Sequence, residues 1–184
     1  MDKEQGLSDD DFLQLLVHTS TWYDKQRLVP MLKVVYKDHI ETYSLESASK
    51  TMDLLKKLMA AGKLSQGNLT LLYDTIHVTE THGLLQKLKM QLPSYRRETL
   101  NEHRENLIRL GKKLTLSDVY IIKELYEETR YKEYKESWSL IVDLEIVGII
   151  SDDGKIMKTF IDKLKRNNIE SGLRALGLRR PIGL

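Results

Sequence analysis

The chain of 184 residues contains no cysteine and only three prolines. The absence of cysteine excludes disulfide bonds, thiolate catalysis and cysteine-based zinc sites. No apolar run approaches the about 20 residues that a membrane-spanning helix needs, and the acidic start lacks the apolar stretch of a secretory signal. We therefore expect a cytoplasmic or nuclear protein that does not associate with a membrane.

A large excess of charge of either sign is also missing. The formal net charge is +2, which is too balanced for a protein that binds polyanions through its bulk charge. The sequence has no glycine-rich phosphate loop, and its five histidines cannot be combined with a nucleophile and an orienting group. His77 and His82 lack the spacing of zinc-binding histidines on a helix, so we expect a loop there. The sequence predicts no catalytic residue, no cofactor and no metal site.

What the chain does contain is one sequence pattern that occurs twice. Five residues of the first copy recur in the second at an offset of 86, the difference between Gly148 and Gly62: Leu54, Leu58, Gly62, Leu64 and Ser65 correspond to Leu140, Leu144, Gly148, Ile150 and Ser151. A glycine suits the left-handed position at the end of a helix, and a serine can cap the next helix. We therefore expect two helical modules of about 90 residues each.

Apolar residues at helical spacing predict up to six short helices in the first module and five in the second. In the first copy we expect a helix over 9–22, a second helix capped by Asp24, a loop or short helix over 37–47, and helices over 48–61, 67–77 and 83–90. In the second copy we expect helices over 100–110, 116–126, 138–147, 155–165 and 169–176. The charged stretch that carries Tyr126, Tyr131 and Tyr134 is interpreted as a solvated loop with Tyr126 in the core, although a tyrosine-rich contact surface stays open.

The same pattern sets the expected domain boundaries. We place the first domain at residues 1–91, the second at 97–177 and a flexible tail at 178–184. The link between the domains contains Pro93 and is too short for a flexible tether. The two modules are therefore expected to pack rigidly together.

Two six-helix modules joined by a short link resemble the tandem death effector domains of initiator-caspase prodomains and of FLIP-type inhibitors. Residues Leu116 to Val119, followed by Leu125 and Tyr126, match the second helix of that family, and Arg166 to Ile169 stands where the family has its Arg-x-Asp-Leu motif. The resemblance implies an all-α fold of two tandem death-fold bundles. It also implies a surface charge triad in which Asp118 and Arg166 are retained and Asn168 replaces the aspartate.

The family also has an exposed Phe-Leu pair on its second helix. This pair corresponds to Val34 and Val35 in the first copy and to Glu124 and Leu125 in the second. The resemblance therefore implies seven protein-interaction residues: Asp118, Arg166, Asn168, Glu124, Leu125, Val34 and Val35. The first copy lacks the arginine and aspartate of the family motif, so a caspase-recruitment or pyrin-like subtype stays open for it.

The resemblance implies a non-enzymatic adaptor or inhibitor that binds death-fold proteins, namely an adaptor or an initiator-caspase prodomain, and regulates caspase recruitment in apoptosis or innate immunity. Self-association stays open, as does a prodomain fragment of a larger caspase-like enzyme. A different alternative is a helical nucleic-acid-binding module that uses the basic C-terminal portion: Lys163, Lys165, Arg166, Arg174, Arg179 and Arg180. The lack of interleaved aromatic residues disfavours nucleic acid as the partner.

Overall fold

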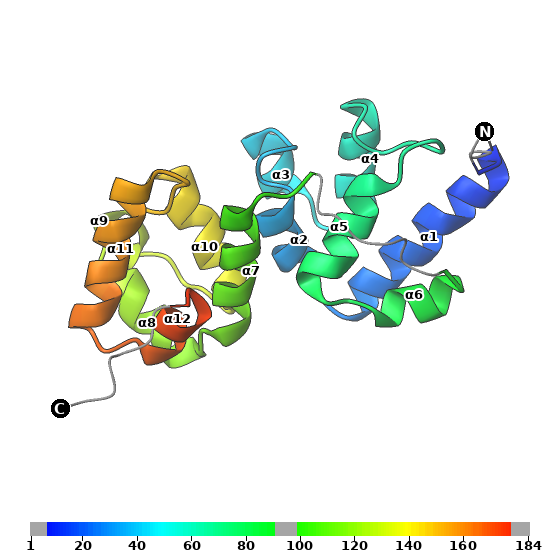
Figure 1. Ribbon diagram of the computed structural model, residues 1–184. Coiled ribbons are helices and arrows are strands. Elements are labelled where there is room, and N and C mark those ends of the chain that lie inside the picture. Colours follow the sequence, from blue (N-terminus) through cyan, green and yellow to red (C-terminus); the bar gives the residue numbers. More distant parts are fainter. Residues whose placement is uncertain (1–6, 91–98, 178–184) are drawn as a thin grey trace. The chain divides into compact units, whose positions relative to one another are not determined.

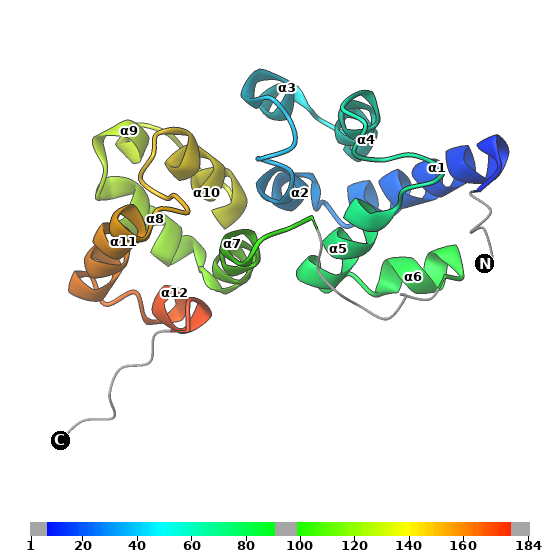
Figure 2. The ribbon, with the colours of Figure 1, turned by 45° about the horizontal axis from the view of Figure 1, so that its top comes forward.

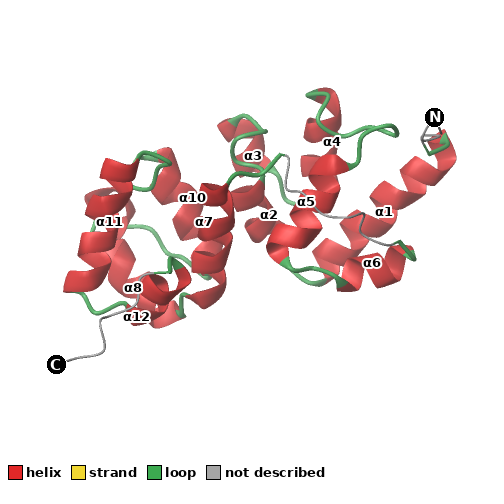
Figure 3. Cartoon of the chain, in the orientation of Figure 1, coloured by secondary structure: helices red, strands yellow, loops and turns green. Residues whose placement is uncertain are grey.

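The computed structural model describes residues 7–90 and 99–177. Within these ranges every regular element is an α-helix, apart from one isolated β-bridge between Ser65 and Asn68 (Figures 1 and 3). The expectation of an all-helical fold is therefore confirmed. The chain divides into two compact units, Met1–Asn101 and Glu102–Leu184. The expected link at 91–97 and the expected tail at 178–184 lie outside the described residues.

The described part of the first unit contains six helices. These are α1 (Asp9–Lys25), α2 (Val29–Val35), α3 (Thr42–Ser47), α4 (Thr51–Ala60), α5 (Thr70–Thr79) and α6 (Gly83–Leu88). Helix α1 packs against α4 and α6, and α2 packs against α4 (Figure 2). The buried face of α1 carries Phe12, Leu15 and Leu16, whose spacing places them on one side of the helix.

Six further helices form the described part of the second unit. They are α7 (Glu102–Lys113), α8 (Leu116–Glu124), α9 (Glu127–Arg130), α10 (Ser137–Ile146), α11 (Gly154–Arg166) and α12 (Glu170–Ala175). Helix α7 packs against α10 and α12, and α8 packs against α10. These contacts are those of the first unit with each helix number raised by six. Three helix contacts thus recur in the two units, and the second unit has further contacts of α11 with α12 and of α9 with α8 and α10.

The repeated sequence pattern forms α4 in one unit and α10 in the other. Both helices are ten residues long. Leu58 and Leu144 occupy the same place in them, and each is only 1% exposed. The glycines that follow have left-handed backbones, with φ of 70° at Gly62 and 79° at Gly148. The amide after each glycine donates to the carbonyl of Leu58 or Leu144, at 2.9 Å in both cases, so the two helices end in the same Schellman motif.

The first residue of each repeated helix is tied to the first helix of its own unit. The amide and hydroxyl of Thr51 donate to the Asp24 carboxylate at 2.8 and 2.7 Å, and the Ser137 hydroxyl donates to the Gly111 carbonyl at 2.5 Å. The expectation that Asp24 caps the second helix is therefore wrong, because α1 continues past Asp24 and its carboxylate is directed to α4.

The junction of the two units also differs from the expected boundary. The predicted helix over 100–110 begins only at Glu102, as α7. The amides of Thr99 and Leu100 donate to the carboxylate of Asp74, a 1% exposed residue of α5, at 2.6 and 3.3 Å. These hydrogen bonds attach the residues before α7 to the first unit. The boundary consequently falls after Asn101 rather than before residue 97.

Candidate interaction surface

Helix α8 begins at a capping box. The Thr115 hydroxyl accepts a hydrogen bond from the backbone N–H of Asp118 at 3.1 Å, and the Asp118 carboxylate accepts one from the backbone N–H of Thr115 at 2.9 Å. The same carboxylate oxygen accepts the Ser171 hydroxyl of α12 at 2.8 Å. Asp118 therefore has two local tasks, which are to define the start of α8 and to join it to α12.

The charge pair that the resemblance implies is not formed. Arg166 lies exposed at the end of α11, and no ion pair joins it to Asp118, although the structure describes both residues. The Asp118 carboxylate is instead engaged by Thr115 and Ser171. The prediction that Asp118 and Arg166 form a surface pair is thus wrong for this structure, and Arg166 remains an exposed cation.

Asn168 ends α11 rather than completing a charge triad. Its φ is 55°, in the left-handed region that asparagine tolerates better than most side chains. The amide of Asn168 donates to the Lys165 carbonyl at 3.2 Å, and the next amide donates to the Leu164 carbonyl at 3.0 Å. The backbone conformation at the end of the helix accounts for the asparagine at this position.

Two substitutions of Asn168 separate backbone conformation from side-chain loss. Both Asn168→Gly and Asn168→Val remove the side-chain carboxamide, but only glycine adopts a left-handed backbone without strain. The left-handed conformation costs residues other than glycine about 1–2 kcal/mol in the folded state. Glycine also has more conformational entropy in the unfolded chain, which lowers the stability of the Asn168→Gly variant and so reduces the difference between the two variants. We expect Asn168→Val to be less stable than Asn168→Gly by about 1 kcal/mol in urea unfolding. Equal stabilities would contradict this role.

The two pairs that correspond to the family's Phe-Leu patch do not form exposed apolar surfaces. Val34 and Val35 are both 0% exposed, so their expected role as surface contacts is wrong. They follow Met31 at i+3 and i+4 and so belong to its buried face of α2. In the second unit Glu124 and Leu125 are only partly exposed, and the Leu125 carbonyl accepts the Lys163 ammonium at 3.3 Å.

Helix α8 nevertheless carries an exposed apolar stripe one turn earlier. Leu116 is 64% exposed, Tyr120 is 62% exposed and Ile121 is 36% exposed. We call these three residues the α8 stripe. On the other side of the helix Val119 and Ile122 are buried. The sequence indicates such a stripe, because α8 contains Leu116, Tyr120 and Ile121 in addition to its buried apolar residues.

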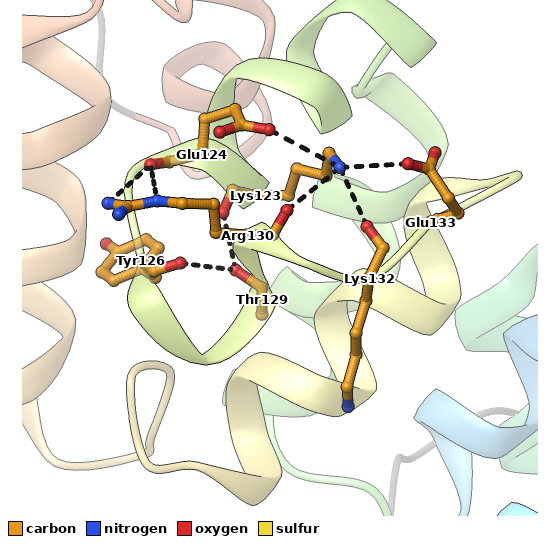
Figure 4. Close-up of polar contacts among 7 residues, drawn as sticks. All are labelled: Lys123, Glu124, Tyr126, Thr129, Arg130, Lys132 and Glu133. Atoms are coloured by element: carbon orange, nitrogen blue, oxygen red, sulfur yellow. Dashed lines mark hydrogen bonds and ion pairs between the residues drawn. The ribbon is translucent and has the colours of Figure 1, made fainter.

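The end of α8 is held by a buried lysine. Lys123 is only 6% exposed, and its ammonium donates to the carbonyls of Lys132 and Arg130 at 2.9 and 3.3 Å (Figure 4). The carboxylates of Glu124 and Glu133 each lie 3.6 Å from the same ammonium. These contacts satisfy a charge that would be costly to bury alone. We call this arrangement the Lys123 clamp.

The clamp fastens a segment that was expected to be a solvated loop. The Thr129 hydroxyl donates to the Lys123 carbonyl at 2.9 Å, and the Arg130 guanidinium donates to the Glu124 carbonyl at 3.4 Å (Figure 4). Part of the segment is the short helix α9. The loop interpretation is therefore wrong for Glu127–Arg130, which form α9. Most residues of 127–136 are nevertheless exposed, as expected, and Tyr126 is partly exposed rather than fully in the core.

The three tyrosines of this segment lie in different environments. The Lys163 ammonium lies 4.2 Å from the centre of the Tyr126 ring, and burial, followed by the charge of Glu128, raises the pKa of Tyr126 to about 12. The Tyr134 hydroxyl donates to Asp143 at 2.6 Å, and burial followed by this carboxylate raises the pKa of Tyr134. Tyr131, in contrast, is 84% exposed.

The basic C-terminal portion forms one solvent face on α11. Four cationic residues of this helix are exposed: Lys155, Lys158, Lys165 and Arg166. Arg174 of α12 is also exposed, whereas Lys163 is directed to Tyr126 and the Leu125 carbonyl. Arg179 and Arg180, which were expected to contribute, lie outside the described residues.

The predicted loop between His77 and His82 is present but short, because it begins only at Glu80. His77 lies within α5, which continues to Thr79, and Glu80 ends the helix with a left-handed φ of 56°. His82 is the exposed residue before α6. Helix α5 begins three residues later and ends two residues later than predicted, and Val78 and Thr79 at its end are buried.

Among residues 7–90 and 99–177, no group of three or more histidine, aspartate or glutamate side chains is placed to hold a metal ion. None of the helices in these ranges is both long and apolar enough to cross a membrane. Comparisons with protein families, curated proteins and solved structures gave no match. Function therefore has to be inferred from the geometry of this chain alone.

Proposed function

We propose that this chain is a non-enzymatic tandem death-fold protein, an adaptor or inhibitor that binds other death-fold proteins and regulates recruitment of an initiator caspase. The observation that carries the proposal is the recurrence of three helix contacts, of the first helix with the fourth and the sixth and of the second with the fourth, in two six-helix units. The shared helix ending at Gly62 and Gly148 adds to it.

The α8 stripe is the proposed contact surface. Apolar and aromatic residues that are desolvated at the centre of an interface provide most of its binding energy. Charged residues on the same unit, such as Arg166 on α11, would set orientation and association rate rather than affinity. This assigns recognition to Leu116, Tyr120 and Ile121, with Arg166 as a charged neighbour in the same unit.

Four finer expectations stay predictions. They are the death effector subtype of each bundle, the rigid packing of the two bundles, the cytoplasmic location and self-association. Under the alternative in which the chain is a prodomain fragment of a larger caspase-like enzyme, the same surface would bind the partner. The two alternatives therefore propose the same contact.

A charge placed in the α8 stripe tests the proposal. Tyr120→Glu is expected to weaken binding to a purified initiator-caspase prodomain by at least about tenfold, because a buried carboxylate would lack a partner in the interface. The melting temperature should change little, since Tyr120 is 62% exposed. Titration calorimetry of the full chain against the prodomain measures the affinity.

Tyr43→Glu is the matched control, because Tyr43 is 76% exposed on α3 of the other unit and should leave binding unchanged. Absence of binding by the wild type, or equal binding by folded Tyr120→Glu, would overturn the proposal. Binding to a random-sequence DNA duplex that falls steeply with salt, without binding to the prodomain, would instead favour the basic face of α11 and a nucleic-acid function.

A further inference from the structure

Tyr131 is the most accessible large apolar or aromatic residue in the described part of the chain, at 84% exposure. Other tyrosine hydroxyls are engaged, since Tyr23 bonds to Thr81 at 2.7 Å and Tyr36 bonds to Thr75 at 2.9 Å. The hydroxyl of Tyr134 is likewise bonded to a carboxylate. Tyr43 and Tyr120 are also well exposed, at 76% and 62%, but Tyr131 is the tyrosine that a second protein can reach most easily.

The Lys123 clamp explains why Tyr131 projects outward. The carbonyls of the residues on either side, Arg130 and Lys132, both accept hydrogen bonds from the Lys123 ammonium. Two inward-directed carbonyls hold the intervening backbone against α8. The side chain of Tyr131 is thereby directed away from the unit, and its exposure is a consequence of the clamp rather than of a loose loop.

Carboxylates lie beside this tyrosine without a cation of their own. Glu127 and Glu128 precede Tyr131 by four and three residues, so the turn of α9 brings them to its side. Within the described ranges neither forms an ion pair. The two cationic residues that flank Tyr131 in the sequence are engaged, because Arg130 donates to the Glu124 carbonyl and Lys132 pairs with Asp143 at 3.0 Å.

We propose that Tyr131 is a phosphorylation site for a protein tyrosine kinase that selects acidic residues before the tyrosine. Charge patterns of this kind are a common basis of kinase specificity. The Tyr131 phenolic oxygen attacks the γ-phosphorus of ATP, the bond from that phosphorus to the bridging oxygen breaks, and ADP leaves with the electron pair. The catalytic base of the kinase accepts the phenolic proton. This inference does not depend on the proposed death-fold function.

Phosphorylation would alter the clamp. The phosphate brings a charge of about −1.5 to −2 to the C-terminal end of α9, next to Glu127 and Glu128. Repulsion from these carboxylates and from the negative end of the helix weakens the turn that the Lys123 clamp holds. The modification thus acts on the same corner of the second unit that carries the α8 stripe.

The test uses the full chain, ATP, Mg²⁺ and the purified catalytic domain of a non-receptor tyrosine kinase with acidic substrate preference. Phosphate incorporation is measured by radiolabel and located by tandem mass spectrometry. We expect Tyr131 to be the main site, and Tyr131→Phe to lose most of the incorporated phosphate. Tyr43→Phe and Tyr120→Phe are matched controls, since both tyrosines are well exposed, and they should retain it.

A Glu127→Gln, Glu128→Gln double variant tests the acidic component, and we expect slower phosphorylation of Tyr131 with an unchanged melting temperature. Three results would overturn the proposal. These are no incorporation into the folded chain, incorporation mainly at Tyr43, Tyr120 or Tyr95, and an unchanged rate in the double variant. Tyr95 lies outside the described residues, so the mass spectrometric map is needed to identify it.

Discussion

Leu144→Ala is expected to lower the free energy of unfolding of the second unit by about 2–5 kcal/mol. Leu144 is 1% exposed in α10, so the substitution removes buried methyl groups and leaves a cavity. Leu58→Ala should have an effect of the same size on the first unit, because Leu58 has the same burial and the same place before the helix-ending glycine. Urea unfolding followed by circular dichroism measures both losses.

Leu116→Ala is the matched control for Leu144→Ala. It makes the same chemical change in the second unit at a side chain that is 64% exposed, where we expect a change within about 0.5 kcal/mol. A Leu144→Ala variant as stable as Leu116→Ala would mean that the repeated pattern does not supply the core residues of the two units.

Gly111→Ala is expected to destabilise the second unit although alanine favours helix formation. A Cβ atom at Gly111 of α7 would lie 2.1 Å from Cζ3 and 2.4 Å from Cε3 of Trp138, so the ring would have to move. Such overpacking costs about 1–3 kcal/mol or more, against a gain of up to about 1 kcal/mol in helix propensity. We expect a net loss of roughly 1–3 kcal/mol in urea unfolding.

Gly154→Ala provides the opposite expectation for the same substitution. Nothing lies within 4 Å of a Cβ built at Gly154, at the start of α11, so alanine should be neutral or stabilising by up to about 1 kcal/mol.

Adding Trp138→Leu to Gly111→Ala should cost less than the sum of the two single changes, because the smaller side chain vacates the space that the methyl group needs. Strict additivity would contradict the proposed clash.

Several features of the fold were predictable because they are encoded by residues close together in the chain. The offset of 86 places Leu58 and Leu144 on equivalent helices, and the left-handed backbones of Gly62 and Gly148 end those helices as the pattern predicts. Helical periodicity and the backbone freedom of glycine are local properties. The sequence alone therefore determined the helical class, the repeat and the ends of the two repeated helices.

The partners of polar side chains were decided only by tertiary structure. Asp24 was expected to cap the next helix, yet it binds Thr51, which lies 27 positions away, and Asp118 binds Ser171 at a separation of 53. A carboxylate can accept from many donors, and sequence spacing does not say which donor the folded chain brings near. The same holds for Lys123, whose ammonium depends on the carbonyls of Arg130, at the end of α9, and of Lys132, just after it.

The candidate site shows the same division. Sequence reasoning predicted the helix that begins at Leu116 and singled out Asp118 for a charge triad, but assigned the apolar surface to Glu124 and Leu125 instead of Leu116, Tyr120 and Ile121. It also counted Val34 and Val35 as surface residues, although packing leaves them 0% exposed. The sequence of a short helix determines which residues share a face, because that follows from helical geometry. Only the packing of the other helices determines which face is covered and which remains free for a partner.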